Sequence, residues 1–100
     1  MGFQPAVFTI NTNFVLPDDG NHYTILVDAS LGDILIDLPL ITDELKGRHF
    51  VVKKIDGTTN LVTLQPAVSN YIDSEANLTI NTTNESVTFT NDGDTDWLIF

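Results

Sequence analysis

The sequence predicts an all-β fold, a small antiparallel β-sandwich or barrel, and three observations favour it. Apolar residues alternate with polar ones along most of the chain, which is the period of a half-buried strand. Val, Ile and Thr make up 30 of the 100 residues, and β-branched side chains fit a pleated sheet better than a helix. Turn-forming clusters separate short segments at regular spacing, as in sandwiches and barrels.

The strands can be placed from this alternation. Tyr23, Ile25 and Val27 alternate along the first clear strand, which we place at 22–28. The same pattern predicts strands over 33–38, 48–55, 60–65, 77–80, 85–90 and 96–100. The segment Asp56–Thr59 contains a Gly and an Asp that favour a turn, so it predicts a pairing of strand 48–55 with strand 60–65.

One segment, 41–47, departs from the strand pattern and predicts a short helical turn near residues 42–46. Thr42 can cap its start, and Asp43 and Glu44 suit the first turn of a helix. Gly47 can adopt the left-handed conformation that ends it. We expect a single β domain over 1–100, with an N-terminal arm or first strands at 1–20 and a core module at 21–100.

Composition excludes several functions. The chain has 4 basic and 14 acidic residues and a formal net charge of −10, which argues against nucleic-acid binding and against docking on an anionic membrane. It contains no Cys, so disulfides and thiolate chemistry are absent. We expect no secretory signal, because the N-terminus lacks a basic region followed by an apolar one, and no membrane span.

The segments near both ends are apolar on both faces of the expected strands. Ala6–Phe8, Phe14–Leu16 and Trp97–Phe100 show this pattern, whereas a half-buried strand should alternate. A second subunit that covers the second face would explain it, and we expect a subunit interface that contains Phe8, Val15, Trp97, Ile99 and Phe100. Cover by the chain's own N-terminal segment is the alternative.

Candidate chemical sites are weak. Asp92, Asp94 and Asp96 alternate like the start of a calcium loop, but the Gly and the Glu that an EF-hand requires are missing. We interpret them as an acidic turn, with a looser calcium site as the alternative. His22 and His49 are the only imidazoles, and no nucleophile motif accompanies them. We therefore expect no enzyme, no cofactor and no metal.

Three rings, Tyr23, Tyr71 and Trp97, could form a sugar-stacking platform, although burial of Trp97 in a core or interface is the favoured interpretation. A host-receptor or glycan-binding module is therefore an alternative function. Its contacts would be Tyr71, His22 and the acidic turns.

A series of short motifs follows from 47 to 99 in a recognisable order. They are GRHFVVKKIDG at 47–57, NLVTLQP at 60–66, YID at 71–73, SVTF at 86–89, NDG at 91–93 and WLI at 97–99. Together they resemble a β module common in bacteriophage tail fibres, head fibres and virion decoration proteins, over roughly residues 23–100. Two turn positions depart from its pattern, because Ser74 stands where the module has Gly and Asn91 where it has Ser.

The resemblance implies a small all-β unit, commonly trimeric, that is built into a virion and offers no catalytic residues. We accordingly expect a non-enzymatic bacteriophage structural protein, a capsid decoration or fibre module that acts by assembly. Its partners would be further copies of itself, with a trimer favoured, and other virion proteins such as the capsid. Its location would be the virion.

Overall fold

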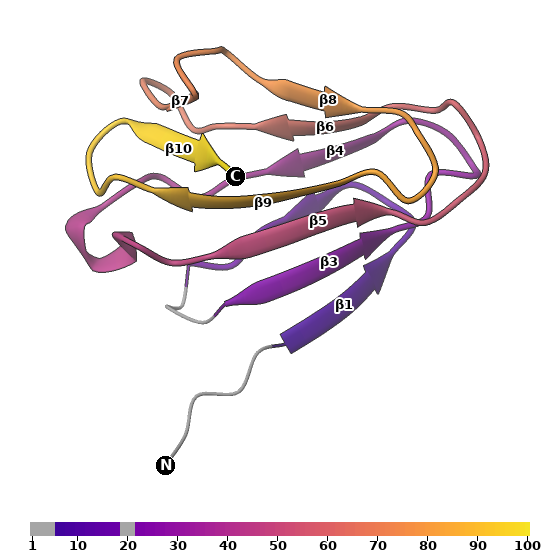
Figure 1. The fold of residues 1–100 in the computed structure, drawn as a ribbon, viewed down its shortest axis with the longest axis horizontal. Helices are drawn as coiled ribbons and strands as arrows, with labels where there is room; N and C mark the ends of the chain where they lie inside the picture. The colour runs from indigo at the N-terminus through magenta and orange to yellow at the C-terminus, as the bar shows by residue number, and fades with distance from the viewer. Residues whose placement is uncertain (1–5, 19–21) are drawn as a thin grey trace.

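The computed structural model describes residues 6–18 and 22–100, and over these the chain is mostly strands (Figure 1). The strands are β1 Ala6–Ile10, β2 Phe14–Val15, β3 Tyr23–Val27, β4 Ile34–Asp37, β5 Phe50–Lys54, β6 Val62–Gln65, β7 Tyr71–Ile72, β8 Leu78–Ile80, β9 Ser86–Asn91 and β10 Asp96–Ile99. The predicted all-β class is confirmed. The N-terminal arm or first strands expected over 1–20 lie partly outside the described residues.

The strands form two packed sheets. Sheet A has the order β1-β3-β5-β9-β10-β7, and sheet B has the order β2-β4-β6-β8. From β1 to β6 the chain places one strand in sheet A and the next in sheet B, so each successive pair forms one coil. Figure 1 shows these coils stacked beside one another.

The expected antiparallel arrangement is wrong for most strand pairs. Among the described strands five pairings are parallel and three are antiparallel. Parallel pairing follows from the coiled path, because a strand that returns to the same sheet after one full coil runs in the same direction as its predecessor. Only β8 and β9, which leave this path, reverse the direction against β6 and β5.

The predicted pairing of strand 48–55 with strand 60–65 is also wrong. β5 lies in sheet A between β3 and β9, whereas β6 lies in sheet B between β4 and β8. The segment Asp56–Thr59 is a turn, but it carries the chain from one sheet to the other. The acidic turn that begins at Asp92 does reverse the chain, since β9 and β10 pair antiparallel.

The core lies between the sheets and is filled by the alternate residues that the sequence pattern selects. Ile25, Val27, Ile36, Val52, Val62, Leu64, Phe89 and Trp97 are completely buried. A row of aromatic rings crosses the inner face of sheet A, with ring centroids 5.4 Å apart for Phe8 and Tyr23 and 6.2 Å apart for Tyr23 and Phe50. This row ties the edge strand β1 to the centre of the core.

The predicted helical turn is present as one turn of 3-10 helix, η1, over Asp43–Leu45. Its buried residue Leu45 anchors it to the body of the protein. The expected cap is wrong, because the Thr42 side chain makes no capping hydrogen bond. Gly47 adopts a positive φ of 79° and ends the turn as expected.

Candidate functional site

Trp97, one of the five residues expected at a subunit interface, lies inside the chain's own core. Its side chain is completely buried, and its ring packs edge-on against Phe50 and Phe89, with centroid distances of 5.6 and 5.5 Å. The prediction that Trp97 contacts another subunit is therefore wrong, because sheet B and the neighbouring strands already cover it. Of the interpretations weighed for this ring, burial in the core is the one that the structure bears out.

The other four residues point in different directions. Ile99 is half-buried and packs against the core, and Phe8 faces inward at the edge of sheet A with 39% of its surface exposed. Val15 lies outward on sheet B and is 68% exposed. Phe100 follows β10 and is 77% exposed. The five residues therefore do not form one surface.

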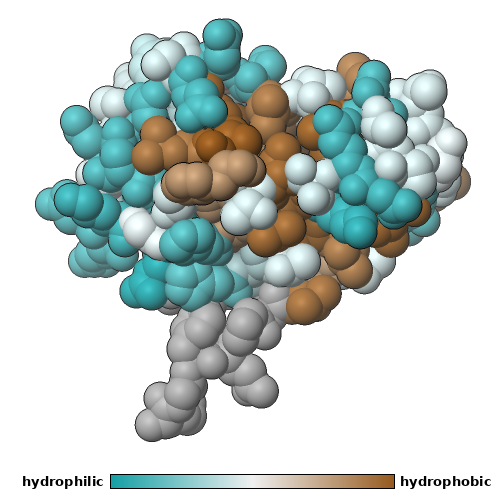
Figure 2. Space-filling model, viewed as in Figure 1, coloured by the Kyte–Doolittle hydropathy of each residue, from teal (hydrophilic) through white to brown (hydrophobic). Residues whose placement is uncertain are grey.

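The outward residues of sheet A form a more coherent surface. Strand alternation places Val7, Thr9, Thr24, Leu26, Val51, Lys53, Ser86, Thr88 and Leu98 on this side, together with Thr90, which is buried. Phe100 extends it, because its N–H donates to the Thr88 carbonyl oxygen at 2.9 Å. Figure 2 shows apolar side chains gathered across the middle of the view, in the region of β10, β9 and β5. We call this set the outer face of sheet A.

This face is almost free of negative charge in a strongly acidic chain. None of the 14 carboxylates lies on β1, β3, β5 or β9, and the only acidic residue on a sheet A strand is Asp96 at the start of β10. Lys53 is the only charged residue within the face itself. Copies of a protein that carry ten net negative charges repel one another least through such a face.

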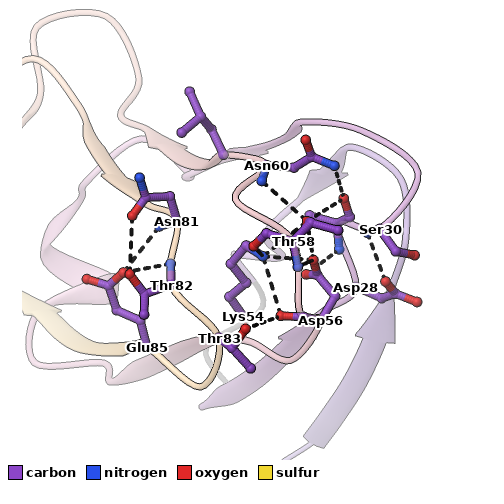
Figure 3. A network of polar contacts seen from close by, with 12 residues as sticks. Asp28, Ser30, Lys54, Asp56, Thr58, Asn60, Asn81, Thr82, Thr83 and Glu85 are labelled. Carbon is purple, nitrogen blue, oxygen red and sulfur yellow. Dashed lines mark hydrogen bonds and ion pairs between the residues drawn. The ribbon is translucent and has the colours of Figure 1, made fainter.

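A buried polar network closes one end of the sandwich (Figure 3). Lys54 is completely buried, and its Nζ lies 2.7 Å from Asp56 Oδ2 and 2.5 Å from the Thr58 carbonyl oxygen. Asp56 also accepts the Ala29 N–H at 2.8 Å and the Thr58 hydroxyl. Asn60 Nδ2 donates to the Ala29 carbonyl oxygen at 2.7 Å. The network therefore ties the turn after β5 to the turn after β3.

Hydrogen bonds dominate the electrostatics of this network. Burial alone would raise the pKa of Asp56, but the hydrogen bonds from Lys54, Thr58 and Ala29 outweigh it and hold that pKa far below its ordinary value of 3.8. Every polar group of the ion pair is engaged, and Thr83 Oγ1 donates to the Asp56 carbonyl oxygen at 2.8 Å. The arrangement is structural in character, since the Lys54 side chain is completely buried and its Nζ bonds to Asp56 and Thr58 within the turn.

The acidic turn after β9 uses its carboxylates to hold its own backbone. Asp92 Oδ1 accepts the N–H groups of Asp94, Thr95 and Asp96 at 2.8 to 3.1 Å. The N–H of Asp94 contributes most to lowering the pKa of Asp92. Asp96 Oδ2 accepts the Ser74 N–H at 2.9 Å. Within residues 6–18 and 22–100, no three His, Asp or Glu side chains gather so that they could hold a metal ion.

The two histidines do come together, from the residues that precede β3 and β5. Their ring centroids are 5.6 Å apart, and the His49 N–H donates to His22 Nδ1 at 2.9 Å. Sequence spacing gives no sign of this contact, which arises from the parallel register of Tyr23 with Phe50.

The ring platform considered for sugar stacking does not form. Tyr23 and Trp97 are buried, with 6% and 0% of their surfaces exposed, while Tyr71 is exposed on the edge strand β7. A shallow hollow elsewhere is lined by Asn11–Asn13 and Leu31–Ile34. It contains one carboxylate, Asp33, and no other titratable side chain.

Fold and surface together define a small two-sheet β protein whose clearest surface feature is an outer sheet face without carboxylates. No helix in the described part of the chain is long and apolar enough to cross a membrane. Neither a scan against protein-family models nor a search of the curated proteins finds a match for this chain.

Proposed function

We propose that this chain is a non-enzymatic structural protein of a bacteriophage virion, a capsid decoration or fibre module, and that it acts by assembling with copies of itself. The single observation that carries the assembly is the outer face of sheet A. It combines apolar and threonine side chains with an absence of carboxylates across four strands. The assignment to a virion is supported by the resemblance of residues 23–100 to the phage β module.

Phe100 is the residue on this face with the most apolar surface to bury. It is 77% exposed, and Leu98 and Thr88 lie beside it on the same side of the sheet. Burial of apolar side chains at the centre of a subunit contact supplies most of its free energy. The trimer that the resemblance implies would place three such faces around a common axis.

The test is the solution mass of the protein and of two aspartate variants, measured by size-exclusion chromatography with light scattering. Wild type is expected at about three times 11.0 kDa, or at a multiple of that mass where trimers associate further. Phe100→Asp should lower that mass about threefold while the protein stays folded, because the side chain is outside the core. Val68→Asp is the matched control, since Val68 is 90% exposed in the loop between β6 and β7, and it should leave the mass unchanged.

Two results would overturn this proposal. A wild-type protein that stays monomeric at the highest attainable concentration would show that the chain does not assemble with itself. A Phe100→Asp protein with the same mass as wild type would show that copies meet elsewhere. Circular dichroism of each variant confirms that it has folded before its mass is interpreted.

A further inference from the structure

We propose that β1 pairs antiparallel with β1 of a second copy, about a two-fold axis at Phe8. The partner's β1 would extend sheet A across the edge that β1 now forms. This inference rests on the proposed function in one respect, that the chain assembles with copies of itself. It adds a second contact, through the backbone edge of β1 and not through the side chains of the outer face of sheet A, and it specifies the register of that contact.

Among the residues that the structure describes, one side of the β1 backbone is paired and the other side is unpaired. Within 6–18 and 22–100, β1 pairs only with β3, in parallel, with Phe8 opposite Ile25 and Ile10 opposite Val27. The Asp28 N–H donates to the Ile10 carbonyl oxygen at 2.8 Å. In a parallel ladder the same residue uses both its N–H and its C=O toward one neighbour, and alternate residues point the other way. Phe8 and Ile10 therefore face β3, and Val7 and Thr9 direct their N–H and C=O groups away from it.

The outward N–H and C=O groups of one copy can pair with the same groups of a second copy. In an antiparallel pair with a two-fold axis at Phe8, Val7 stands opposite the partner's Thr9, and Thr9 stands opposite the partner's Val7. Each such pair exchanges two backbone hydrogen bonds. Phe8 then faces the partner's Phe8 as the closely spaced, non-hydrogen-bonded pair, the position in which aromatic side chains interact best across strands. Phe8 still exposes 39% of its surface, which this contact would cover.

The β1 edge lacks the features that normally prevent strand addition. Proteins protect edge strands with charged residues, prolines, bulges or very short strands. β1 is five residues long, and residues 6–16 contain no charged side chain. The opposite edge of sheet A is protected, because β7 has only two residues and is followed by Asp73 and Glu75. Val7 adds an exposed apolar surface, at 64%.

A second copy is the partner that these features fit best. A strand of another protein could use only the unpaired backbone groups of β1. A second copy would in addition place its own uncharged β1 edge and its own Phe8 ring against those of the first copy. None of the 14 acidic residues lies within residues 6–16, so copies are repelled less through this edge than through the acidic parts of the surface. The contact is isologous and joins copies in pairs. It would give dimers alone, or pairs of trimers where the outer face of sheet A is also engaged.

The test uses Thr9→Pro with Thr9→Val as its control. The Thr9 N–H points away from β3, so proline removes the donor that the partner needs and leaves the β1–β3 ladder intact, as is typical of proline on edge strands. Valine keeps that donor. Light scattering should show the mass of Thr9→Pro reduced twofold relative to wild type, with no reduction for Thr9→Val. Amide hydrogen exchange in wild type should be slow at Val7 and Thr9, and should increase more than tenfold at Val7 in Thr9→Pro.

Three outcomes would overturn the pairing. Equal masses for Thr9→Pro and wild type would exclude it and would leave the proposed function standing if Phe100→Asp is monomeric. Fast exchange at Val7 and Thr9 in an oligomeric wild type would exclude it in the same way. A wild type that is monomeric throughout would exclude both the pairing and the assembly that it rests on.

Discussion

Lys54 Nζ lies 2.7 Å from Asp56 Oδ2, and the two side chains expose only 0% and 5% of their surfaces. The pair is shielded from water, but it is well supplied with hydrogen bonds. The Thr58 carbonyl and hydroxyl groups and the Ala29 N–H also bond to it. Its importance lies in its position. It fixes the turn at which the chain leaves sheet A for sheet B.

Removing one partner of this pair should be severe. Asp56→Ala leaves the Lys54 ammonium buried without its counter-charge, which costs about 3–5 kcal/mol in comparable pairs. Chemical denaturation should show this loss of unfolding free energy. Lys54→Met in the Asp56→Ala background should restore part of the loss, since an apolar chain of similar length replaces the unpaired charge. A double variant as unstable as Asp56→Ala would contradict this account.

Stability should fall in acid through Asp56. Its pKa is lowered in the folded protein, so the unfolded chain takes up a proton at a higher pH than the folded one. The contribution is therefore complete at neutral pH and decreases as the pH falls below about 4, near the ordinary value of 3.8. Thermal unfolding between pH 2.5 and 7 should show a flatter profile for Asp56→Asn than for Asp94→Asn, a control in the exposed turn after β9.

Gly93 should tolerate alanine less well than Gly47. Both have positive φ, 77° and 79°, so alanine costs conformational energy of about 1–2 kcal/mol at each. A Cβ at Gly93 would also lie 2.9 Å from Cβ, Cγ and Cδ of Lys46, whereas one at Gly47 meets nothing within 4 Å. Denaturation midpoints should fall for both variants and further for Gly93→Ala. Equal midpoints would show that Lys46 moves aside freely.

Thr90→Val should leave the free energy of unfolding unchanged or raise it by up to about 1 kcal/mol, because the buried hydroxyl makes no hydrogen bond that valine would remove. Thr90 Oγ1 is buried and has no hydrogen-bond partner among the residues that the structure describes. Thr88→Val is the control on the same strand and the same side of sheet A. Calorimetry that shows a loss above 1 kcal/mol for Thr90→Val alone would assign a hydrogen bond to this hydroxyl.

Local patterns predicted the strands well and their partners poorly. The alternation of Tyr23, Ile25 and Val27 identifies a strand and its buried face, because burial depends on the nearest layer of side chains. Nothing in that alternation says whether the next strand lies in the same sheet. The turn at Asp56–Thr59 was compatible with a hairpin, and only the buried contacts of Asp56 with Lys54 and Ala29 direct the chain to the other sheet.

The apolar run at 97–100 combines core residues with outward-facing ones. Trp97 and Ile99 face the core, and Leu98 and Phe100 face outward. Composition alone could not separate the two pairs, because a tryptophan suits a core and an interface equally. The open backbone of β1 was likewise invisible in the sequence, since it depends on which side of the strand β3 occupies.

The place of β10 in sheet A has a consequence for how the protein is made. β7 pairs only with β10 within the described sheet, and the Asp73 N–H donates to the Trp97 carbonyl oxygen at 2.8 Å. A ribosome delivers residues 71–73 well before residues 96–99, and domains fold as their last required segment emerges. Until then the core lacks the indole that fills the space beside Phe50 and Phe89. Completion of this fold during synthesis therefore awaits β10.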